Sequence, residues 1–523
     1  MSHLSRECRN SDQAGSGRHP ASLAHAGQSR LILDPNSLDD YRTFLAIKRL
    51  PSYRIRGCVA TFPAEYAERI GRDIARAVVE ADYDPPAWHF DYQAAITRLA
   101  IRKRKFSTFI ECGLGKTGII LEYAKHVAGL LGSDRRVLIV SPLMVVKQTI
   151  DEAAKFYGGN YPIEQVKAAE LQDWLDRQGE CVGITNYEAI RQDIRRGRLG
   201  CLILDESSML KSHYGKWGTK LIELGRGLEW KLCCTGTPAP NDRIEYGNHA
   251  VFMDAFPNVN AFLAKFFVNR GQTSERWELK SHALRPFYLA LSHWCIFVTN
   301  PATYGWRDNA ENIPPIHVHD HEVPLTDEQV RLVYAKTGRL IADKIGGITS
   351  RSVLSQIAKG SYKGQRIASN KPGYVRELVD SWPDESSLVW CKFNAEQELL
   401  ADALPDAASL EGSTPMEARA EAIAAFKAGQ LRTIISKPEI LGFGLNLQKA
   451  TRQVFSACDD SYEDYHQCVK RSNRVGSTRP LNVHIPVTEI ERPLMENVLR
   501  KAAMVQRDTE EQEAIFRAAA YEW

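Results

Sequence analysis

The chain has 523 residues, enough for two or three domains that each bury a core of their own. Its hydrophobic fraction of 44% and charged fraction of 25% are those of an ordinary soluble globular protein. The net charge is only +3, which excludes a global electrostatic argument for nucleic acid, so any basic surface must be local.

The eleven cysteines form no Cys-x-x-Cys pair and no Cys/His cluster at zinc spacing. Several, such as Cys201 and Cys391, lie in apolar runs and are expected to be buried strand residues, which suits a reducing cytosol. No apolar stretch approaches the length of a membrane span. Residues 1–30 lack the apolar core of a secretory signal, so we expect a disordered tail there, with a transit peptide as the alternative.

Residues 31–85 are predicted to form a small appended module. A strand-like stretch at 54–62 is followed by a helical run at 64–80, and no catalytic constellation falls among them. Pro85 and Pro86 then break the chain.

The sequence Gly-Leu-Gly-Lys-Thr at 113–117 is a candidate phosphate-binding loop between an apolar strand and a helix-forming run. Its two glycines would let the backbone wrap a phosphate, and the N–H groups that open the helix would point at it. The lysine would place a charge on the β/γ-phosphates and the threonine a hydroxyl on Mg²⁺. The full P-loop pattern has glycine where this chain has Ile110, so a chance glycine turn is the alternative. The candidate residues are Gly113, Gly115, Lys116 and Thr117.

Gln93 lies about twenty residues before this loop. Its amide can donate to and accept from the edge of adenine at once, and a nearby aromatic residue, Phe90 or Tyr92, could stack on the base. The position favours adenine recognition over an ordinary helix start. The basic run at 98–105 is interpreted first as a solvated helix face and second as a nucleic-acid contact.

Apolar runs alternate with helical stretches after the loop, which predicts a parallel sheet covered on both faces. The predicted strands are 137–140, 182–185, 201–204 and 231–234. Ligands of such sheets bind outside the carboxyl ends of the strands, so the informative residues should follow each strand.

Polar residues do follow these strands. Ser141, Asn186 and Tyr187 could contact a phosphodiester or simply make turns. Asp205 and Glu206 form an acidic pair at a strand end. Placing two carboxylates there costs free energy unless a cation or a substrate proton compensates them. Asp205 would hold Mg²⁺, and Glu206 would orient and deprotonate the attacking water, with a structural salt bridge as the alternative.

In order and spacing, these motifs resemble the first lobe of the superfamily-two helicases. The residues that carry the resemblance are Gln93, Gly-Leu-Gly-Lys-Thr at 113–117, Asp-Glu-Ser-Ser at 205–208 and Thr-Gly-Thr-Pro at 235–238. Leu210-Lys211 after the acidic pair is similar to the Snf-type translocase version, closest to its phage and bacterial type. Asp-Glu-Ser-Ser stands where the family commonly has Asp-Glu-Ala-His.

The second half extends the resemblance. Ile-Pro-Pro at 313–315, followed by 323–329, is similar to the Snf-type connection between lobes, although 295–300 lacks the usual arginine pair. Independently, the prolines and the polar stretch 303–312 predict a linker. Further apolar runs predict a second sheet, at 388–391, 431–435, 452–455 and 482–485.

The stretch Gln-x-x-x-Arg-x-x-Arg-x-Gly at 467–476 resembles the arginine-finger motif of the family. Arg471 and Arg474 lie three apart and so share one helix face, and guanidinium groups suit the spread charge of a phosphoryl-transfer transition state. A solvated basic helix is the alternative. Ser477 stands where the family commonly has glutamine.

The resemblance covers roughly residues 86–490. It implies an α/β fold of two tandem RecA-like lobes, 86–300 and 331–490, with a linker at 301–330 and with ATP and Mg²⁺ in the cleft. Independently, apolar residues at helical spacing predict that residues 491–523 form a helical brace packed on the lobes. The catalytic residues would be Lys116, Glu206, Arg471 and Arg474. ATP would contact Gln93, Gly113, Gly115, Lys116, Thr117, Gly444 and Gln467. Mg²⁺ would be held by Thr117 and Asp205. Nucleic acid would contact Ser141, Asn186, Tyr187, Lys392, Asn446 and Gln448.

We therefore expect an ATP-dependent motor that moves along DNA in the cytoplasm of a bacterium or a phage-infected cell. Translocation on duplex DNA is favoured over strand separation, and no membrane association is expected. The alternatives are an RNA helicase, a P-loop ATPase that acts on protein or small molecules, and an inactive scaffold that binds nucleic acid.

Overall fold

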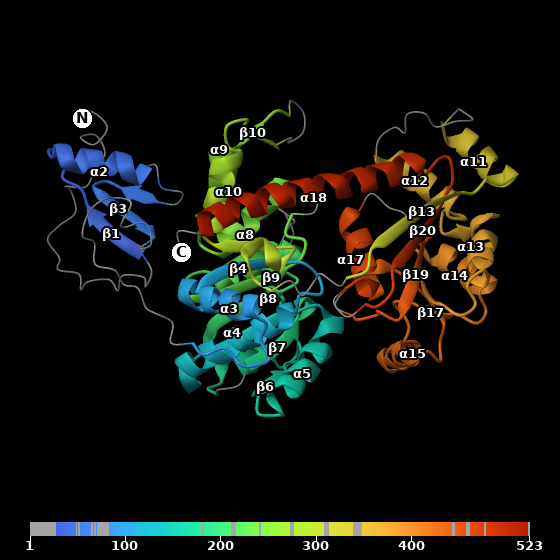
Figure 1. The fold of residues 1–523 in the computed structure, drawn as a ribbon, viewed down its shortest axis with the longest axis horizontal. Helices are drawn as coiled ribbons and strands as arrows, with labels where there is room; N and C mark the ends of the chain where they lie inside the picture. Colours follow the sequence, from blue (N-terminus) through green and yellow to red (C-terminus); the bar gives the residue numbers. More distant parts are fainter. Residues whose placement is uncertain are drawn as a thin grey trace.

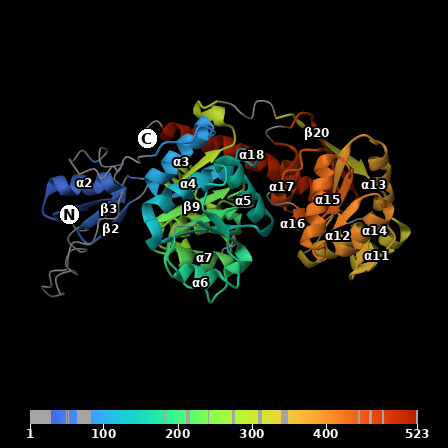
Figure 2. The same cartoon turned by 90° about the horizontal axis from the view of Figure 1, so that it is seen from below.

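The structure is a computed structural model in which a small N-terminal module and two α/β lobes follow one another along the chain (Figures 1 and 2). It describes residues 28–520 except 49, 51–52, 64–65, 67–69, 71–82, 180–181, 211–215, 240–241, 272–276, 308–312, 338–347, 442–444, 457–460 and 475–476. Most of the predicted tail and of the predicted helix at 64–80 therefore lie outside the described residues. Among these residues no helix is long and apolar enough to cross a membrane.

The N-terminal module is an antiparallel sheet, in the order β1-β3-β2, with helix α2 packed on it. The predicted strand at 54–62 is a hairpin instead, because Gly57 turns the chain with a φ of +54°. Leu33, Phe44 and Phe62 form the centre of its core. The elements are β1 (Gln28–Ile32), α2 (Leu38–Lys48), β2 (Arg54–Arg56) and β3 (Val59–Pro63).

In the described part of lobe 1, seven parallel strands form one sheet in the order β12-β4-β9-β8-β5-β7-β6. The predicted parallel sheet is confirmed, and two short strands at its edges, β6 and β12, add to it. The strands are β4 (Lys105–Ile110), β5 (Arg136–Ser141), β6 (Ile163–Gln165), β7 (Val182–Asn186), β8 (Leu199–Asp205), β9 (Trp230–Thr235) and β12 (Cys295–Val298).

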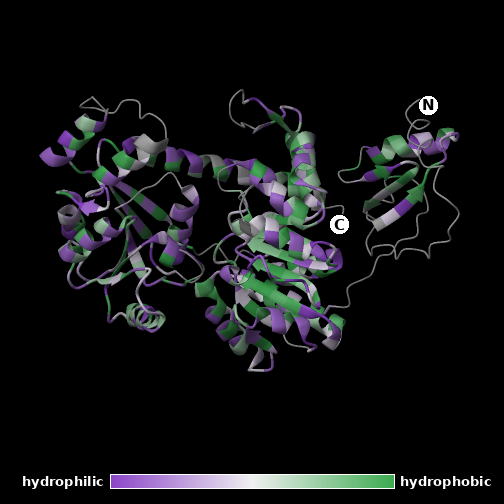
Figure 3. Ribbon diagram, turned by 180° about the vertical axis from the view of Figure 1, so that it is seen from behind, coloured by the Kyte–Doolittle hydropathy of each residue, from purple (hydrophilic) through white to green (hydrophobic). Residues whose placement is uncertain are grey.

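Helices cover both faces of this sheet, and the strands are mostly hydrophobic along their length (Figure 3). Alternate residues of β8 belong to the two cores on opposite faces of the sheet. Leu202 and Leu204 pack on one face, and Cys201 and Ile203 pack on the other. A hairpin of β10 (Phe267–Asn269) and β11 (Trp277–Leu279) follows α9. The helices are α3 (Asp91–Lys103), α4 (Lys116–Leu131), α5 (Leu143–Tyr157), α6 (Leu171–Asp176), α7 (Lys216–Gly225), α8 (Tyr246–Phe252), α9 (Val259–Phe266) and α10 (Leu284–Ser292).

Lobe 2 is a second parallel sheet, with six strands among the described residues in the order β13-β20-β19-β16-β18-β17. Its edge strand β13 comes from the stretch predicted to be linker. That strand is polar and mostly exposed, so no apolar pattern marked it. The strands are β13 (Ile316–Glu322), β16 (Ser386–Trp390), β17 (Ala408–Leu410), β18 (Thr433–Ser436), β19 (Ala450–Phe455) and β20 (Leu481–Val487).

Helices also flank the sheet of lobe 2, and a short hairpin of β14 (Ser361–Tyr362) and β15 (Gln365–Arg366) follows α12. Ile423 and Phe426 on α15 are buried in its core. The helices are α11 (Asp327–Thr337), α12 (Ile348–Ala358), α13 (Lys371–Asp380), α14 (Asn394–Ala403), α15 (Met416–Ala428), α16 (Pro438–Leu441) and α17 (Tyr462–Ser472).

The last helix, α18 (Arg492–Ala520), extends from lobe 2 to lobe 1 (Figure 1). Met495 and Val498 near its start are buried in the core of lobe 2, whereas Phe516 near its end is buried in the core of lobe 1. At about 1.5 Å per residue, the helix is roughly 44 Å long. One continuous element therefore packs against both lobes.

Candidate nucleotide site between the lobes

The phosphate loop joins the end of β4 to the start of α4. Gly113 and Gly115 have φ values of +94° and +70°, in the left-handed region that favours glycine. A Cβ at Gly115 would lie 2.3 Å from Nε2 of Gln93. Within the described residues no side chain caps the first turn of α4, and the N–H of Gly118 donates to the main-chain oxygen of Gly115 at 3.1 Å. The N–H groups at this end of the helix are those that an anion would meet.

Gln93 on α3 forms a hydrogen bond with this loop. Its Nε2 donates to the main-chain oxygen of Gly115 at 3.1 Å, its Oε1 accepts from the N–H of Phe90 at 3.0 Å, and the residue is only 5% exposed. The amide predicted to read adenine is thus already engaged by the chain. Tyr92 is buried and donates to the oxygen of Leu114, whereas Phe90 is 46% exposed with its ring stacked on that of Tyr92 at 5.8 Å.

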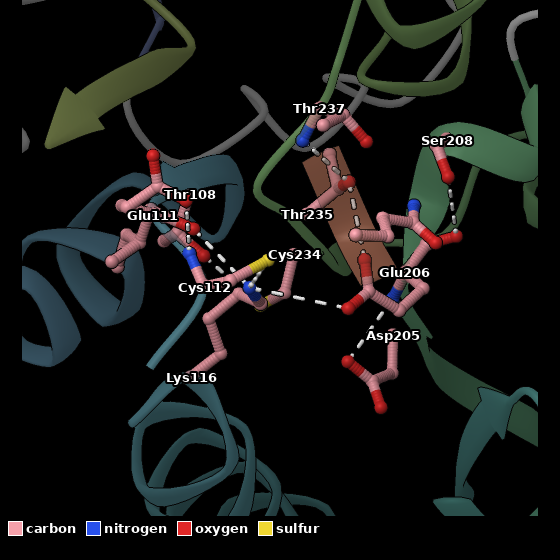
Figure 4. A network of polar contacts seen from close by, with 12 residues as sticks. Thr108, Glu111, Cys112, Lys116, Asp205, Glu206, Ser208, Cys234, Thr235 and Thr237 are labelled. Carbon is pink, nitrogen blue, oxygen red and sulfur yellow. Dashed lines mark hydrogen bonds and ion pairs between the residues drawn. The ribbon is translucent and has the colours of Figure 1, made fainter. Parts of the chain in front are cut away.

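Lys116 projects from the loop towards the acidic pair (Figure 4). Its Nζ donates to the main-chain oxygen of Ile110 at 3.2 Å and lies 4.0 Å from Oε1 of Glu206. Burial alone would lower the pKa of Lys116, but the surrounding acidic groups, including Cys112, Glu206 and Asp205, raise it above its usual range. The side chain is therefore a fixed cation at the end of β4.

The acidic pair lies at the carboxyl end of β8. Ser141 Oγ donates to Asp205 Oδ2 at 2.8 Å, and the main-chain N–H of Glu206 donates to Asp205 Oδ1 at 3.0 Å. Burial and the adjacent Glu206 raise the pKa of Asp205 above its usual range. Two buried carboxyl groups side by side are costly as anions, so the pair favours the approach of a cation.

Glu206 has a strained backbone, with a φ of +49° that non-glycine residues seldom adopt. Thr235 at the end of β9 donates to Glu206 Oε2 at 3.4 Å, and the N–H of Thr237 donates to the hydroxyl of Thr235 at 3.1 Å (Figure 4). Strain of this kind persists only where neighbouring contacts enforce it. The turn after β9 thus helps to aim the carboxylate of Glu206.

His249 on α8 packs against Ser207, the residue that follows the acidic pair. Its Nε2 lies 3.1 Å from Oγ of Ser207, and its ring meets Phe109 edge to face at 5.3 Å. Burial lowers the pKa of His249 to about 4, so the ring is neutral near pH 7. Sequence reasoning missed this residue, because a single histidine in an apolar helix belongs to no motif.

The arginines on the other side of the site belong to lobe 2. Arg471 on α17 is 4% exposed and donates through one nitrogen to the oxygen of Leu445 at 3.4 Å. Its Nε and second terminal nitrogen have no hydrogen-bond partner in the part of the chain that the structure describes. Buried donors without partners are the groups that a phosphate would satisfy. Arg474 lies past the end of α17, so the two arginines do not share one helix face as predicted. Burial and the neighbouring Arg471 lower the pKa of Arg474.

The two halves of the site touch through α17. His466 Nε2 lies 3.5 Å from Glu111 Oε2, at the foot of the phosphate loop. Thr237 Oγ1 donates to Glu463 Oε1 at 3.3 Å, and Gln467 donates to the same oxygen at 3.4 Å. Although burial would raise the pKa of Glu111, Lys470 and His466 hold it well below its usual range. Phosphate loop, acidic pair and arginines thus converge at one boundary.

The predicted polymer contacts have mixed positions. Tyr187 is buried and donates to the main-chain oxygen of Asp205 at 2.7 Å, so it and Ser141 lie against the acidic segment, not on an outer surface. Asn186 caps its own turn, with Oδ1 accepting from the N–H of Ala189 at 2.8 Å. Lys392 and Asn446 are exposed on lobe 2. Gln448 is half-buried, and Gly444 lies outside the described residues.

Lys211 of the similar Snf-type motif also lies outside the described residues, whereas Leu210 is buried. Two cations of the basic run after Gln93 are engaged in ion pairs. Arg104 pairs with Glu229, and Lys105 pairs with Asp254 at 2.8 Å. For these two residues the contacts favour a structural role over a polymer contact.

Two family models match the sequence of this chain. The chain matches the SNF2-related domain over residues 109–371 and the helicase conserved C-terminal domain over residues 370–476. A solved structure of the Sulfolobus solfataricus SWI2/SNF2 ATPase core in complex with dsDNA aligns with 82% of this chain and 96% of that chain, at 18% identity and a TM-score of 0.39.

Two curated relatives match parts of the sequence. ATP-dependent helicase fft1 of Schizosaccharomyces pombe is 30% identical over 130 residues, which are 24% of this chain and 14% of fft1. Helicase domino of Drosophila melanogaster is 27% identical over 182 residues, 31% of this chain and 6% of that protein. This chain therefore spans a small part of the length of both relatives. Since the SNF2-related match alone covers half of the chain, the protein belongs to the SNF2-related family of superfamily-two ATP-dependent helicases and translocases.

Proposed function

We propose that this protein is a DNA-dependent ATPase that converts ATP hydrolysis into movement along duplex DNA. The observation that carries the proposal is the division of the site: the phosphate loop and acidic pair belong to lobe 1, and the unsatisfied donors of Arg471 belong to lobe 2. Neither lobe holds all the groups that phosphoryl transfer needs, so closure of the lobes would control hydrolysis.

The residues present fit ATP and Mg²⁺. Gly113, Gly115 and Lys116 would hold the phosphates, and Thr117 and Asp205 would hold the metal. Magnesium takes only one or two protein ligands beside phosphates and water, so one hydroxyl and one carboxylate suffice. When bound, Mg²⁺ would neutralise charge that develops on the phosphates.

The chain's own groups would then divide the chemistry. Glu206, aimed by Thr235, would orient the attacking water and accept its proton. Arg471 and Arg474 would stabilise the charge that spreads over the transferred phosphoryl group. Ser141 would act as a positioning residue, because its hydroxyl holds one oxygen of Asp205 in place.

Sequence features similar to the Snf type support a duplex as the track. Leu210 after the acidic pair is one, and the Pro-Pro connection that leads to Gln329 is another. Gln329 is buried and donates to the main-chain oxygen of Ile357 at 2.7 Å, which ties α11 to α12 in lobe 2. Exposed Lys392 and Asn446 are candidates for contacts with the phosphate backbone.

The test is the ATPase rate with no polymer, single-stranded DNA, duplex DNA and RNA, followed by two displacement assays. We expect duplex DNA to stimulate hydrolysis most, and stimulation to fall steeply with salt because phosphate contacts dominate binding. A third strand wound on duplex DNA should be displaced in an ATP-dependent way, whereas a forked duplex should open poorly. Efficient opening of the fork without displacement of the third strand would contradict duplex translocation.

A further inference from the structure

One face of the N-terminal sheet carries the basic residues of its strands. The core that α2 covers contains Leu31 of β1 and Leu33 just after that strand. It also contains Ala60 and Phe62 of β3. Since side chains alternate along a strand, the residues between them lie on the opposite face. The exposed arginines on that outer face are Arg30 on β1 and Arg54 and Arg56 on β2.

The strand register gathers these three arginines around the central strand. Arg30 and Arg54 are both partners of Thr61 on β3, one from each side. With neighbouring strands about 4.8 Å apart, the two arginines start about 10 Å from each other. Arg54 and Arg56 are two residues apart on one strand, a rise of about 6.6 Å. The result is a flat cationic surface, hereafter the arginine face.

The acidic residues of the described module lie in the other layer. Asp34, Asp39 and Asp40 all fall just before or within the first turn of α2. The N–H of Asp34 donates to Asp40, and Asp39 pairs with Arg42 at 3.1 Å on that helix. Within the described residues no ion pair or side-chain hydrogen bond engages the arginines of the arginine face, so their charges remain available to a partner.

We propose that the arginine face is a second binding surface for the phosphodiester backbone of the DNA on which the motor acts. Guanidinium groups bind phosphate oxygens with paired donors, and a flat row of them suits a polymer with closely spaced phosphates. The net charge of +3 gives the whole chain no such attraction, so this local surface has a distinct role. The identity of the polymer rests on the proposed function.

The position of the module agrees with an accessory anchor beside lobe 1. The ring of Tyr53 lies 5.8 Å from Nζ of Lys265 on α9, and the ring of Tyr66 lies 5.5 Å from that of His293. Tyr53 and Tyr66 both belong to the core on the α2 side of the sheet. The contacts with lobe 1 therefore leave the arginine face uncovered by these residues.

The test compares three variants of the full chain with the wild type. The first carries Arg30→Gln, Arg54→Gln and Arg56→Gln together, and the second carries Thr61→Glu, which puts a negative charge at the centre. Arg42→Gln, an exposed arginine on α2, is the control. Binding of a fluorescent duplex is measured by anisotropy at about 50 to 200 mM salt, without ATP, after circular dichroism shows that each variant is folded.

We expect the triple variant to bind the duplex about tenfold or more weakly than the control. The slope of log affinity against log salt should be shallower by about 2 to 3, since each lost phosphate contact removes about 0.9. Thr61→Glu should weaken binding in the same direction, and polymer-free ATPase should be unchanged in all variants.

Equal affinity and equal salt slope in the triple variant and the control would overturn the assignment of this face, while DNA-stimulated ATPase would leave the motor function standing. Weaker binding to anionic phospholipid vesicles with unchanged DNA binding would also overturn it, in favour of a membrane surface. A wild-type chain that binds no DNA would overturn both proposals.

Discussion

The ammonium group of Lys116 lies between the main-chain oxygen of Ile110 and the carboxylate of Glu206, and little solvent reaches it. Lys116→Ala would leave Glu206, Asp205 and Glu111 near one another without this cation. We expect ATP binding to weaken and hydrolysis to fall by at least about 10²-fold, the scale for loss of one preorganised electrostatic group. Binding of a fluorescent nucleotide and the ATPase rate measure the two effects.

Lys125→Ala is the matched control, because Lys125 lies on the same helix with its side chain 51% exposed. A Lys116→Ala enzyme that hydrolyses ATP like this control would remove the lysine from the mechanism.

The hydroxyl of Ser141 is the donor that fixes Oδ2 of Asp205. In Ser141→Ala the carboxylate loses a charge-assisted hydrogen bond, worth about 1.5–3 kcal/mol in proteins. We expect the Mg²⁺ concentration for half-maximal ATPase to rise by about tenfold, the change that 1.4 kcal/mol produces. Ser436→Ala, at the end of β18 in lobe 2, is the control because its buried hydroxyl also bonds within the sheet but far from Asp205. An unchanged Mg²⁺ midpoint would contradict a positioning role.

At the scale of residues, the sequence indicated most of the groups that meet at the lobe boundary but not how each one is held. A glycine-rich loop, an acidic pair and spaced arginines have few other uses in combination, so they could be predicted. A polar residue at a strand end can face either the polymer or the neighbouring strand, and only packing places Ser141 and Tyr187 against Asp205. His249 carried no pattern at all.

At the scale of elements, the strand pair β13–β20 contains a stack of histidines. The ring of His484 on β20 lies 4.9 Å from that of His319 and 5.2 Å from that of His321, both on β13. Trp382 covers it at 4.7 Å. Burial first, then His321 and His319, lowers the pKa of His484 to about 3, with Arg452 lowering and Glu385 raising it. Burial also lowers the pKa of His321.

In the folded protein the pKa values of His484 and His321 lie below the value of about 6.5 for an unfolded histidine. The unfolded chain therefore binds protons at a pH at which these two histidines are still neutral in the folded protein. The contribution of these two histidines to the stability of lobe 2 should thus be fully present above about pH 6.5 and should be lost as the pH falls towards 3. Melting temperatures between pH 8 and pH 5 measure this loss. In His484→Phe, which keeps a ring in the stack, we expect a shallower decline, whereas exposed His282→Asn should follow the wild type.

Strand β13 shows why the sequence did not predict some elements. β13 reads Ile-His-Val-His-Asp-His-Glu, with most side chains exposed, so its apolar content is too low to indicate a strand. It becomes one because β20 offers a free edge in register with it. By contrast, strands buried on both faces, such as β5 and β8, are continuous apolar runs and could be predicted from the sequence.

At the scale of the whole molecule, the proposed mechanism requires the arginines of lobe 2 to complete a site whose other parts belong to lobe 1. Arg474→Ala should leave nucleotide binding nearly intact, since the phosphate loop is unchanged, but cut turnover by about 10³-fold, as for other arginine fingers. Titration with a fluorescent nucleotide and single-turnover hydrolysis separate the two steps. Arg479→Ala, five residues on and exposed, is the control. Equal loss of binding and turnover would instead indicate a ground-state ligand.

Helix α18 couples the lobes, because its ends are buried in different cores. The ring of Phe516 meets that of Phe297 at 5.1 Å in lobe 1, and Gln512 donates to the hydroxyl of Tyr288 at 3.0 Å. Phe516→Ala should cost about 3–5 kcal/mol of local packing and release this end, while Met495 and Val498 keep the other end in lobe 2. We expect faster hydrogen exchange in the last turns of α18 and unchanged nucleotide binding to lobe 1. DNA-stimulated turnover should fall severalfold, because lobe 2 would return less often to a position from which its arginines reach the phosphate. Glu511→Ala, exposed on the same helix, should change none of these quantities. Faster exchange with undiminished turnover would show that α18 stabilises the fold without guiding closure.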